Sequence, residues 1–223
     1  ILSPLIVGFR ILKGKEDRIR FKEKFCFPSK KKVGKNLLWF HGSSVGEILS
    51  ILPLIYELEK NKSIDQILIT SSTLSSAEIF KKFTFRKTVH QFFPIDSILY
   101  SYKFINYWKP TIAIFVESEI WPSIFRVVAK KNIPLLLLNA RITKKTFNKW
   151  NYIKSFSNSV FKNISRAYPQ NNETFNYLKK LNVSKIKIMG NLKFVNNEHD
   201  KLIKLDRALL KNLKNRKIWC ASS

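Results

Sequence analysis

Cysteine, glycine and acidic residues are scarce in this chain, and the cysteine and glycine patterns exclude particular kinds of site. Among 223 residues there are two cysteines, six glycines and 15 acidic residues, against 41 Lys and Arg. Cys26 and Cys220 have neither metal-ligand nor Cys-x-x-Cys spacing, so we interpret them as free thiols in a reducing compartment. Neither Gly-x-Gly-x-x-Gly nor a Walker A sequence occurs, which excludes a standard nucleotide-binding fingerprint.

A long apolar run is also missing. The apolar stretch at residues 1–12 is interrupted by Pro4 and Arg10, and it is shorter than the roughly 20 residues that a membrane-spanning helix needs. It fits either the end of a longer anchor or an interfacial helix followed by the basic residues 13–24. Because the chain starts at Ile1 and stops soon after an apolar run, we expect it to be truncated at both ends.

The excess of positive charge is the most visible global property. The formal charge of +26 suits nucleic acid, an anionic membrane or a phosphorylated substrate as partner. The cations are dispersed, and the signatures of the common nucleic-acid-binding motifs are absent, so nucleic acid is the minor alternative. A hydrophobic content of 45% with 18 Phe is ample for a packed core and excludes a disordered chain.

From residue 36 onward, short apolar runs alternate with helical patterns. The predicted strands are residues 37–40, 66–70, 89–93, 112–116, 135–138, 166–168 and 185–189. The predicted helices are residues 47–60, 75–83, 97–108, 120–131, 145–162, 171–181 and 201–215. Continuous apolar strands between helices indicate an α/β fold with a doubly wound, mostly parallel, Rossmann-like sheet.

The same pattern suggests a division into three parts. We expect residues 1–35 to form a membrane-proximal segment and basic linker, with a short helix within residues 13–35. Residues 36–215 would form the Rossmann-like domain, and residues 216–223 would begin a further, truncated domain.

The first strand and helix meet in a turn that we take as the centre of the site. The turn contains Gly42, Ser43, Ser44 and Gly46, and Glu47 follows at the start of the helix. Free N–H groups at a helix N-terminus make a place for a ligand, and glycine permits close approach or positive φ. The same residues also fit a plain capping box, with Ser44 as N-cap and Glu47 as its partner.

Polar residues follow the other predicted strands as well, at the edge where ligands of parallel sheets bind. Thr73 belongs to a hydroxyl-rich loop that fits either an anion site or a helix start. Glu117 and Glu119 would share a face if extended, although Glu119 also fits a helix cap. Arg141 suits a phosphate or a carboxylate, or a salt bridge to either Glu. The three histidines, including His41, are too scattered for a metal site.

Taken together, the motifs resemble the 3-deoxy-D-manno-octulosonic acid (Kdo) transferases of Gram-negative bacteria. The resemblance covers nearly the whole chain and rests on the order of these stretches: Trp39-Phe-His-Gly-Ser-Ser-Val-Gly-Glu47, Ile69-Thr-Ser-Ser-Thr73, Phe93-Pro-Ile-Asp96, Val116-Glu-Ser-Glu-Ile-Trp-Pro122, Leu138-Asn-Ala-Arg141, Met189-Gly-Asn-Leu-Lys-Phe194 and Trp219-Cys-Ala-Ser-Ser223.

The resemblance implies a GT-B glycosyltransferase, of which this chain is the amino-terminal, acceptor-binding half. The acceptor would be the lipid A precursor (lipid IVA), and the donor CMP-Kdo would bind a carboxy-terminal domain beyond Ser223. The family implies no metal at the reaction centre and no cofactor. It also implies attachment to the cytoplasmic face of the bacterial inner membrane, an anionic surface that suits a cationic protein.

The resemblance also assigns roles to individual residues. Glu47 occupies the general-base position of an inverting transfer, and we expect the helix dipole to keep it ionised. Residues expected to bind substrate are Ser43, Ser44, Gly46, Thr73, Glu117, Glu119, Arg141, Asn191 and Lys193, the last two near the donor. The alternatives are a cationic binding module without catalysis and a GT-B enzyme with another nucleotide-sugar donor.

Overall fold

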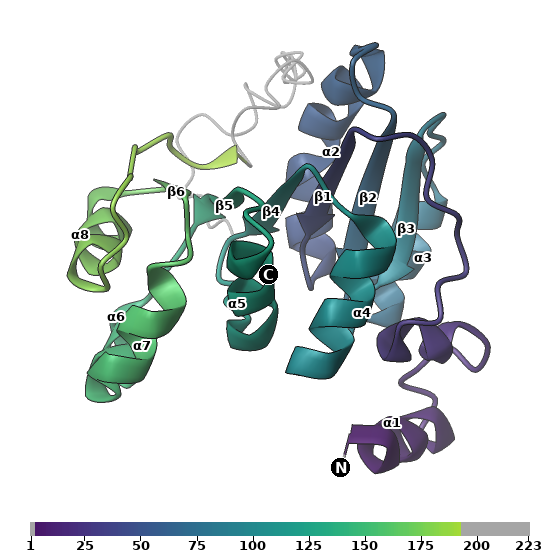
Figure 1. Ribbon diagram of the computed structural model, residues 1–223, viewed down its shortest axis with the longest axis horizontal. Coiled ribbons are helices and arrows are strands. Elements are labelled where there is room, and N and C mark those ends of the chain that lie inside the picture. The colour runs from purple at the N-terminus through teal and green to yellow at the C-terminus, as the bar shows by residue number, and fades with distance from the viewer. Residues whose placement is uncertain (1–2, 193–223) are drawn as a thin grey trace, which may run out of the picture. The chain divides into compact units, whose positions relative to one another are not determined.

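The computed structural model of the protein describes residues 3–192, and within them a single parallel sheet organises the chain (Figure 1). The sheet has six strands in the order β3-β2-β1-β4-β5-β6. Every pairing is parallel. The strands are β1 (Leu37–His41), β2 (Gln66–Ser71), β3 (Thr88–Phe92), β4 (Ile112–Val116), β5 (Leu135–Ala140) and β6 (Arg166–Pro169). This doubly wound topology confirms the predicted Rossmann-like fold.

Helices cover both faces of the sheet, which explains why its strands are continuous apolar runs (Figure 1). One face carries α2 (Val45–Lys60) and α3 (Leu74–Lys81), and the other carries α4 (Ile98–Trp108) and α5 (Pro122–Lys130). Successive side chains of β1 alternate between the two resulting cores. Trp39 packs in the core beneath α4 and α5, and Phe40 packs in the core beneath α2, each with no exposed surface.

Two predicted elements differ from the structure. The helix expected over residues 145–162 is two helices, α6 (Lys144–Tyr152) and α7 (Lys154–Phe161), because Ile153 between them has ψ of 52°, outside the helical range. Residues 185–189 form only an isolated bridge between Ile186 and Ala167, and α8 (Asn172–Lys180) precedes them. Ile188 and Met189 are exposed there, so this segment does not bury both faces as a central strand does. The helix expected at residues 201–215 lies outside the described residues.

Charged residues attach the amino-terminal segment to the edge of the sheet. This segment comprises α1 (Ser3–Leu12) and the 3₁₀ helix η1 (Arg20–Phe25). Glu23, which is 1% exposed, accepts hydrogen bonds from Arg20 Nε at 2.8 Å and from the Phe92 backbone N–H at 2.7 Å. Arg20 Nη2 in turn donates to the His90 carbonyl at 3.0 Å. These bonds cover β3, which would otherwise be an open edge strand.

Removal of the buried carboxylate should therefore loosen this attachment. In Glu23→Ala, the Phe92 N–H loses its acceptor and the Arg20 guanidinium loses its carboxylate partner but keeps the His90 carbonyl. Breaking a buried pair from one side costs about 3–5 kcal/mol. We expect a loss of that order in the free energy of unfolding, measured by urea denaturation. Glu57→Ala removes a carboxylate that pairs with Lys60 on the exposed side of α2 and should leave the midpoint unchanged. Equal midpoints for the two variants would contradict this account.

Candidate active site

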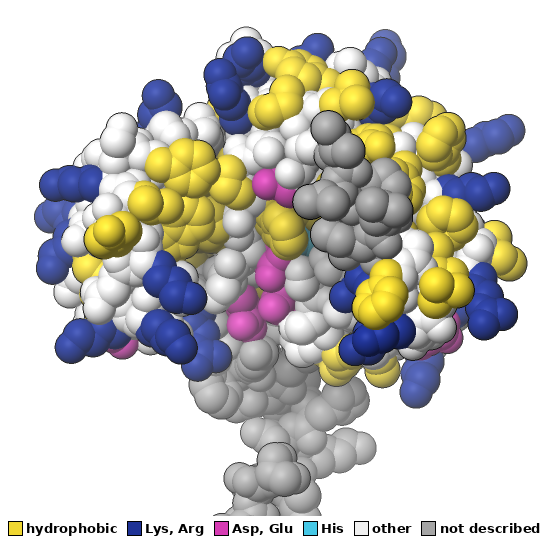
Figure 2. All heavy atoms as spheres, turned by 90° about the horizontal axis from the view of Figure 1, so that it is seen from below, with side chains coloured by type: hydrophobic (Ala, Val, Ile, Leu, Met, Phe, Trp, Pro, Cys, Tyr) yellow, Lys and Arg dark blue, Asp and Glu magenta, His cyan; other side chains and the backbone are white. Residues whose placement is uncertain are grey.

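The site lies where the winding of the sheet reverses, between β1 and its neighbour β4. Helices that follow these two strands return on opposite faces, so a crevice forms beyond their carboxyl ends. His41 ends β1, and Glu117 directly follows β4. Figure 2 shows acidic side chains gathered in the middle of one face, with Lys and Arg around its periphery.

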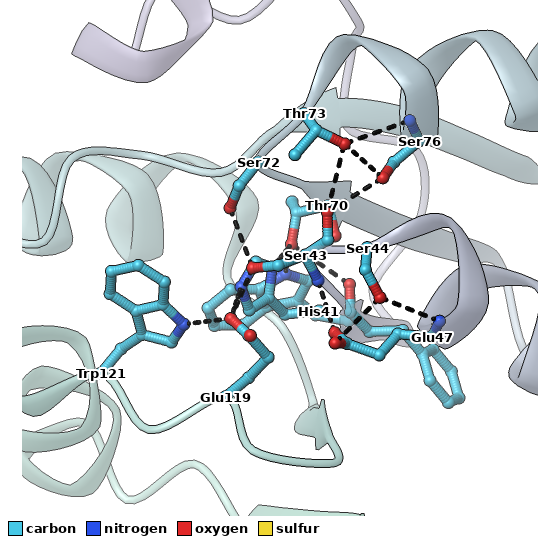
Figure 3. A network of polar contacts seen from close by, with 12 residues as sticks. His41, Ser43, Ser44, Glu47, Thr70, Ser72, Thr73, Ser76, Glu119 and Trp121 are labelled. Atoms are coloured by element: carbon cyan, nitrogen blue, oxygen red, sulfur yellow. Dashed lines mark hydrogen bonds and ion pairs between the residues drawn. The ribbon is translucent and has the colours of Figure 1, made fainter.

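Glu47 folds back on the turn that precedes α2. Ser44 is the N-cap of the helix: its Oγ accepts the Glu47 backbone N–H at 3.3 Å and donates to Glu47 Oε1 at 3.0 Å. The Ser43 backbone N–H donates to Glu47 Oε2 at 2.7 Å. The capping geometry anticipated from the sequence is thus present, and it fixes both carboxylate oxygens of Glu47 against residues 43 and 44 (Figure 3).

The two glycines of the turn lie in different surroundings. A Cβ on Gly42 would lie 3.1 Å from Glu47 Cβ, so a larger residue there would press on the Glu47 side chain, and the close approach favours glycine. Gly46 lies in the exposed first turn of α2. Neither glycine has the positive φ that was considered from the sequence; close contact at Gly42 is the operative reason.

Glu119 connects three parts of the site through one carboxylate oxygen (Figure 3). Its Oε2 accepts the Ser43 hydroxyl at 2.6 Å and the Trp121 indole N–H at 2.7 Å, and it lies 3.1 Å from His41 Nε2. The alternative that Glu119 caps α5 is wrong. Asp96 caps that helix instead, because its carboxylate accepts the backbone N–H groups of residues 123 and 124.

The two neighbouring carboxyl groups differ in their affinity for a proton. Burial raises the pKa of Glu47, and the charge of Glu119 raises it further, against the hydrogen bonds from Ser43 and Ser44. Burial also acts to raise the pKa of Glu119, but the hydrogen bonds from His41, Ser43 and Trp121 outweigh it, so the net shift is downward. Burial is the largest influence on Glu47, and Glu47 is the more basic of the two; the expectation that the helix dipole keeps Glu47 ionised stays a prediction.

The hydroxyl-rich loop after β2 supports the turn from the other side. Thr73 is the N-cap of α3, where its Oγ1 accepts the Ser76 N–H at 3.2 Å. Thr73 Oγ1 lies 3.4 Å from the Ser43 carbonyl, and Ser76 Oγ donates to the same carbonyl at 2.9 Å. Thr73 therefore starts a helix, as one alternative held, and also fixes Ser43.

Of the site residues predicted after β4 and β5, Glu117 and Arg141 are joined by a backbone hydrogen bond. Glu117 has a left-handed φ of 56° and is buried, so residues 117–119 turn rather than extend, contrary to the sequence-based view of a shared strand face. The Arg141 backbone N–H donates to the Glu117 carbonyl at 3.3 Å, but its side chain is exposed. Within residues 3–192 no ion pair joins Arg141 to Glu117 or Glu119.

The residues expected near the donor lie at the end of the described chain. Asn191 is half-buried, next to Leu192, whose backbone N–H donates to Asn139 Oδ1 at 3.1 Å. Lys193 and the cysteine at position 220 lie outside the described residues. Cys26 is a free thiol, and burial raises its pKa to about 11.

Sequence reasoning missed His41. The residue was set aside as one of three scattered histidines, yet its ring is fully buried and contacts both Thr70 and Glu119. The only available signal was its position at the carboxyl end of the first strand. In the part of the chain that the structure describes, no group of three or more His, Cys, Asp or Glu side chains is arranged to hold a metal ion.

Comparison with known proteins supplies the identity. Residues 19–196 match the family of 3-deoxy-D-manno-octulosonic-acid transferases (kdotransferases). The chain belongs to this family. The 3-deoxy-D-manno-octulosonic acid transferase of Rickettsia bellii is 36% identical over 98% of this chain, and that of Haemophilus influenzae is 29% identical over 100% of this chain. The resemblance seen in the motifs is confirmed.

The chain spans about half the length of these Kdo transferases, 53% and 54% respectively. Among solved structures, the UDP-GlcNAc 2-epimerase of Neisseria meningitidis matches 80% of this chain and 53% of its own, with a TM-score of 0.52 and 14% identity. That likeness establishes the Rossmann-like fold of this Kdo transferase domain and nothing about its substrates.

The raised pKa of Glu47 makes a prediction about stability. A carboxyl group whose folded-state pKa exceeds its unfolded value, about 4.3 for Glu, lowers stability as pH rises through the folded pKa. Glu47→Gln should therefore be more stable than the wild type at pH 7, and this difference should disappear as the pH falls toward about 4. Thermal unfolding at several pH values measures it, with Glu57→Gln on the exposed face of α2 as control. A pH-independent difference would contradict the assignment.

Proposed function

We propose that the full-length protein transfers Kdo from CMP-Kdo to the lipid A precursor lipid IVA, with inversion and with Glu47 as general base. The observation that carries this proposal is a carboxylate of raised pKa at the β1–α2 turn, beside the crevice where the sheet reverses. Membership of the Kdo transferase family supports the choice of donor and acceptor. The chain would act as the acceptor-binding half of a GT-B enzyme, inactive without the donor-binding half.

The geometry suits Glu47 to proton abstraction. Ser43 N–H and Ser44 Oγ hold its two oxygens, and the upward shift of its pKa moves it toward neutral pH, where a general base works best. In the proposed step Glu47 takes the proton of the acceptor hydroxyl while that oxygen attacks the anomeric carbon of Kdo. CMP leaves with the electron pair of the broken bond as an already stabilised phosphate. A single displacement inverts the anomeric centre.

Loss of the base should abolish most of the transfer but not the binding. We expect Glu47→Gln in the full-length enzyme to reduce kcat by about 10²–10⁴-fold, the usual contribution of general base catalysis. Acceptor affinity, measured by binding to vesicles that contain lipid IVA, should change little. Glu57→Gln on the same helix should match the wild type in both measurements. Undiminished transfer by Glu47→Gln would show that the protein does not use this base.

A cavity next to the carboxylates offers room for the lipid end of the acceptor. Its volume is about 350 Å³, and it adjoins the site at Ser72 and Trp121. Its walls include the apolar Val7 and Phe93 and the cations Arg10 and Lys24, both of which pair with Glu16 in the same wall. This mixture suits a ligand that is acylated and phosphorylated.

Membrane attachment would bring the enzyme to such an acceptor at the cytoplasmic face of the inner membrane. No helix within residues 3–192 has both the length and the apolar character needed to cross a bilayer. Instead, α1 exposes Phe9 and Leu12, 58% and 84% accessible, beside the basic Lys13 and Lys15. Apolar side chains flanked by cations are what an interfacial contact with anionic lipid requires.

Replacing these side chains should weaken membrane binding. Burial of one large apolar side chain contributes about 1.5–3 kcal/mol, so Phe9→Ser with Leu12→Ser should lower partitioning to phosphatidylglycerol vesicles at least about tenfold. Flotation of the vesicles measures it. Tyr152→Ser, which removes a side chain equally exposed on α6, should float like the wild type. A double variant that still floats fully would rule out α1 as the contact.

The two alternatives make different predictions in the same assays. A cationic binding module would bind vesicles but show no transfer that depends on Glu47. An enzyme with another donor would show Glu47-dependent transfer only when CMP-Kdo is replaced by a different nucleotide sugar.

A further inference from the structure

The ring of His41 is held at both nitrogens and has no contact with solvent. Nδ1 lies 3.1 Å from the Thr70 carbonyl oxygen and 3.0 Å from Thr70 Oγ1. Nε2 lies 3.1 Å from Glu119 Oε2. Phe93 stacks on the ring at 3.8 Å between centroids, and Phe115 and Trp121 contact it in T-shaped geometry. The imidazole is therefore a fixed bridge from β2 to the loop after β4 (Figure 3).

The partners of His41 decide where its protons lie. A carbonyl oxygen only accepts, so Nδ1 next to the Thr70 carbonyl must carry hydrogen. Thr70 Oγ1 accepts the Trp39 indole N–H at 2.9 Å and donates to the Phe40 carbonyl at 3.2 Å, so it too turns a lone pair toward Nδ1. With Nδ1 protonated, a neutral ring would turn the Nε2 lone pair toward an ionised carboxylate oxygen, and two acceptors facing each other at 3.1 Å would repel. A proton must therefore lie between Nε2 and Oε2.

We propose that His41 is a positioning residue: it holds Glu119 through one proton shared between Nε2 and Oε2, and through Glu119 it fixes the turn that binds Glu47. The chain of contacts is continuous. Glu119 Oε2 accepts the Ser43 hydroxyl, and the Ser43 backbone N–H donates to Glu47 Oε2. This inference rests on the proposed role of Glu47 as base.

The shared proton also has an electrostatic effect. It makes the His41–Glu119 pair neutral as a whole, and the pair titrates as a unit. Burial lowers the pKa of His41 and outweighs its hydrogen bond to Glu119, which acts in the opposite direction. The contacts at both ring nitrogens are what place a proton between Nε2 and Oε2. Charged groups near the pair among the described residues include Glu47 on α2, Glu117 after β4, and Lys24 of η1, whose Nζ lies 3.4 Å from the Ser72 carbonyl. Without the proton of His41, the full charge of Glu119 would act on Glu47.

Two substitutions separate position from charge in the full-length enzyme. His41→Asn keeps an amide near the place of Nδ1 but does not reach Glu119, whereas His41→Gln places an uncharged N–H donor near the place of Nε2. We expect kcat to fall on the order of 100-fold in His41→Asn, the effect of a misplaced catalytic group, and much less in His41→Gln. In both variants the acidic limb of the pH–kcat profile should move further to higher pH, because the charge of Glu119, which already raises the pKa of Glu47, would no longer be offset by a proton on His41.

His90→Gln is the matched control. His90 is also buried and bonded at both nitrogens, to Ser71 Oγ and to Arg20, but it contacts neither Glu47 nor Glu119. This variant should lose stability and keep the acidic limb of the wild type. If folded His41→Asn and His41→Gln also kept that limb, His41 would be a packing residue only and the proposal would be overturned.

A spectroscopic measurement keeps the inference testable even if the protein transfers no Kdo. In protein with ¹⁵N-labelled histidine, the signal lost in His41→Gln identifies His41. We expect its Nδ1 to be protonated and its Nε2 shift to lie between those of a bare and a fully protonated nitrogen. That shift should change in Glu119→Gln. A bare Nε2 that is insensitive to Glu119→Gln would refute the shared proton, whereas absent transfer with the expected spectrum would refute only the proposed function.

Discussion

A single carboxylate oxygen joins the parts of this domain on which its site depends. Glu119 Oε2 contacts His41 at the end of β1, the Ser43 hydroxyl in the β1–α2 turn, and the Trp121 indole just before α5. Because β1 and β4 are neighbours whose helices lie on opposite faces, nothing in the main-chain ladder fixes the loops beyond their ends relative to each other. Charge-assisted hydrogen bonds to one oxygen supply that constraint, and they are stronger than bonds between neutral groups.

The sequence allowed the sheet and the centre of the site to be predicted for physical reasons. The strands are buried on both faces, so they appear as unbroken apolar runs, and the turn at Ser43 and Glu47 combines residue types that cap a helix. In parallel sheets, ligands bind beyond the carboxyl ends of the strands, and this placed residues 43–47 and 117–119 in one predicted site without any knowledge of distances.

The failures have a common origin in long-range contacts. His41 and Glu119 are 78 residues apart, and nothing local to either indicates that they meet. The cap of α5 comes from Asp96, 28 residues before Ile124, so the nearer Glu119 was considered in its place. Glu117 adopts a left-handed conformation, which costs a non-glycine residue on the order of 1–3 kcal/mol and which the surrounding packing must impose. Each of these depends on tertiary structure, which local patterns do not report.

Although the chain is strongly cationic, no Lys or Arg within residues 3–192 forms an ion pair with Glu47. With 41 Lys and Arg against 15 acids, a cation could be expected beside every carboxylate. Within residues 3–192, however, the Lys and Arg ion pairs involve Glu16, Glu23, Glu57 and Glu78, whereas Glu47 is held by a backbone N–H and a hydroxyl. A lysine at Glu47 would stabilise its ionised form and lower its pKa, which would make it a weaker base. Neutral donors fix the position of the carboxylate without that loss.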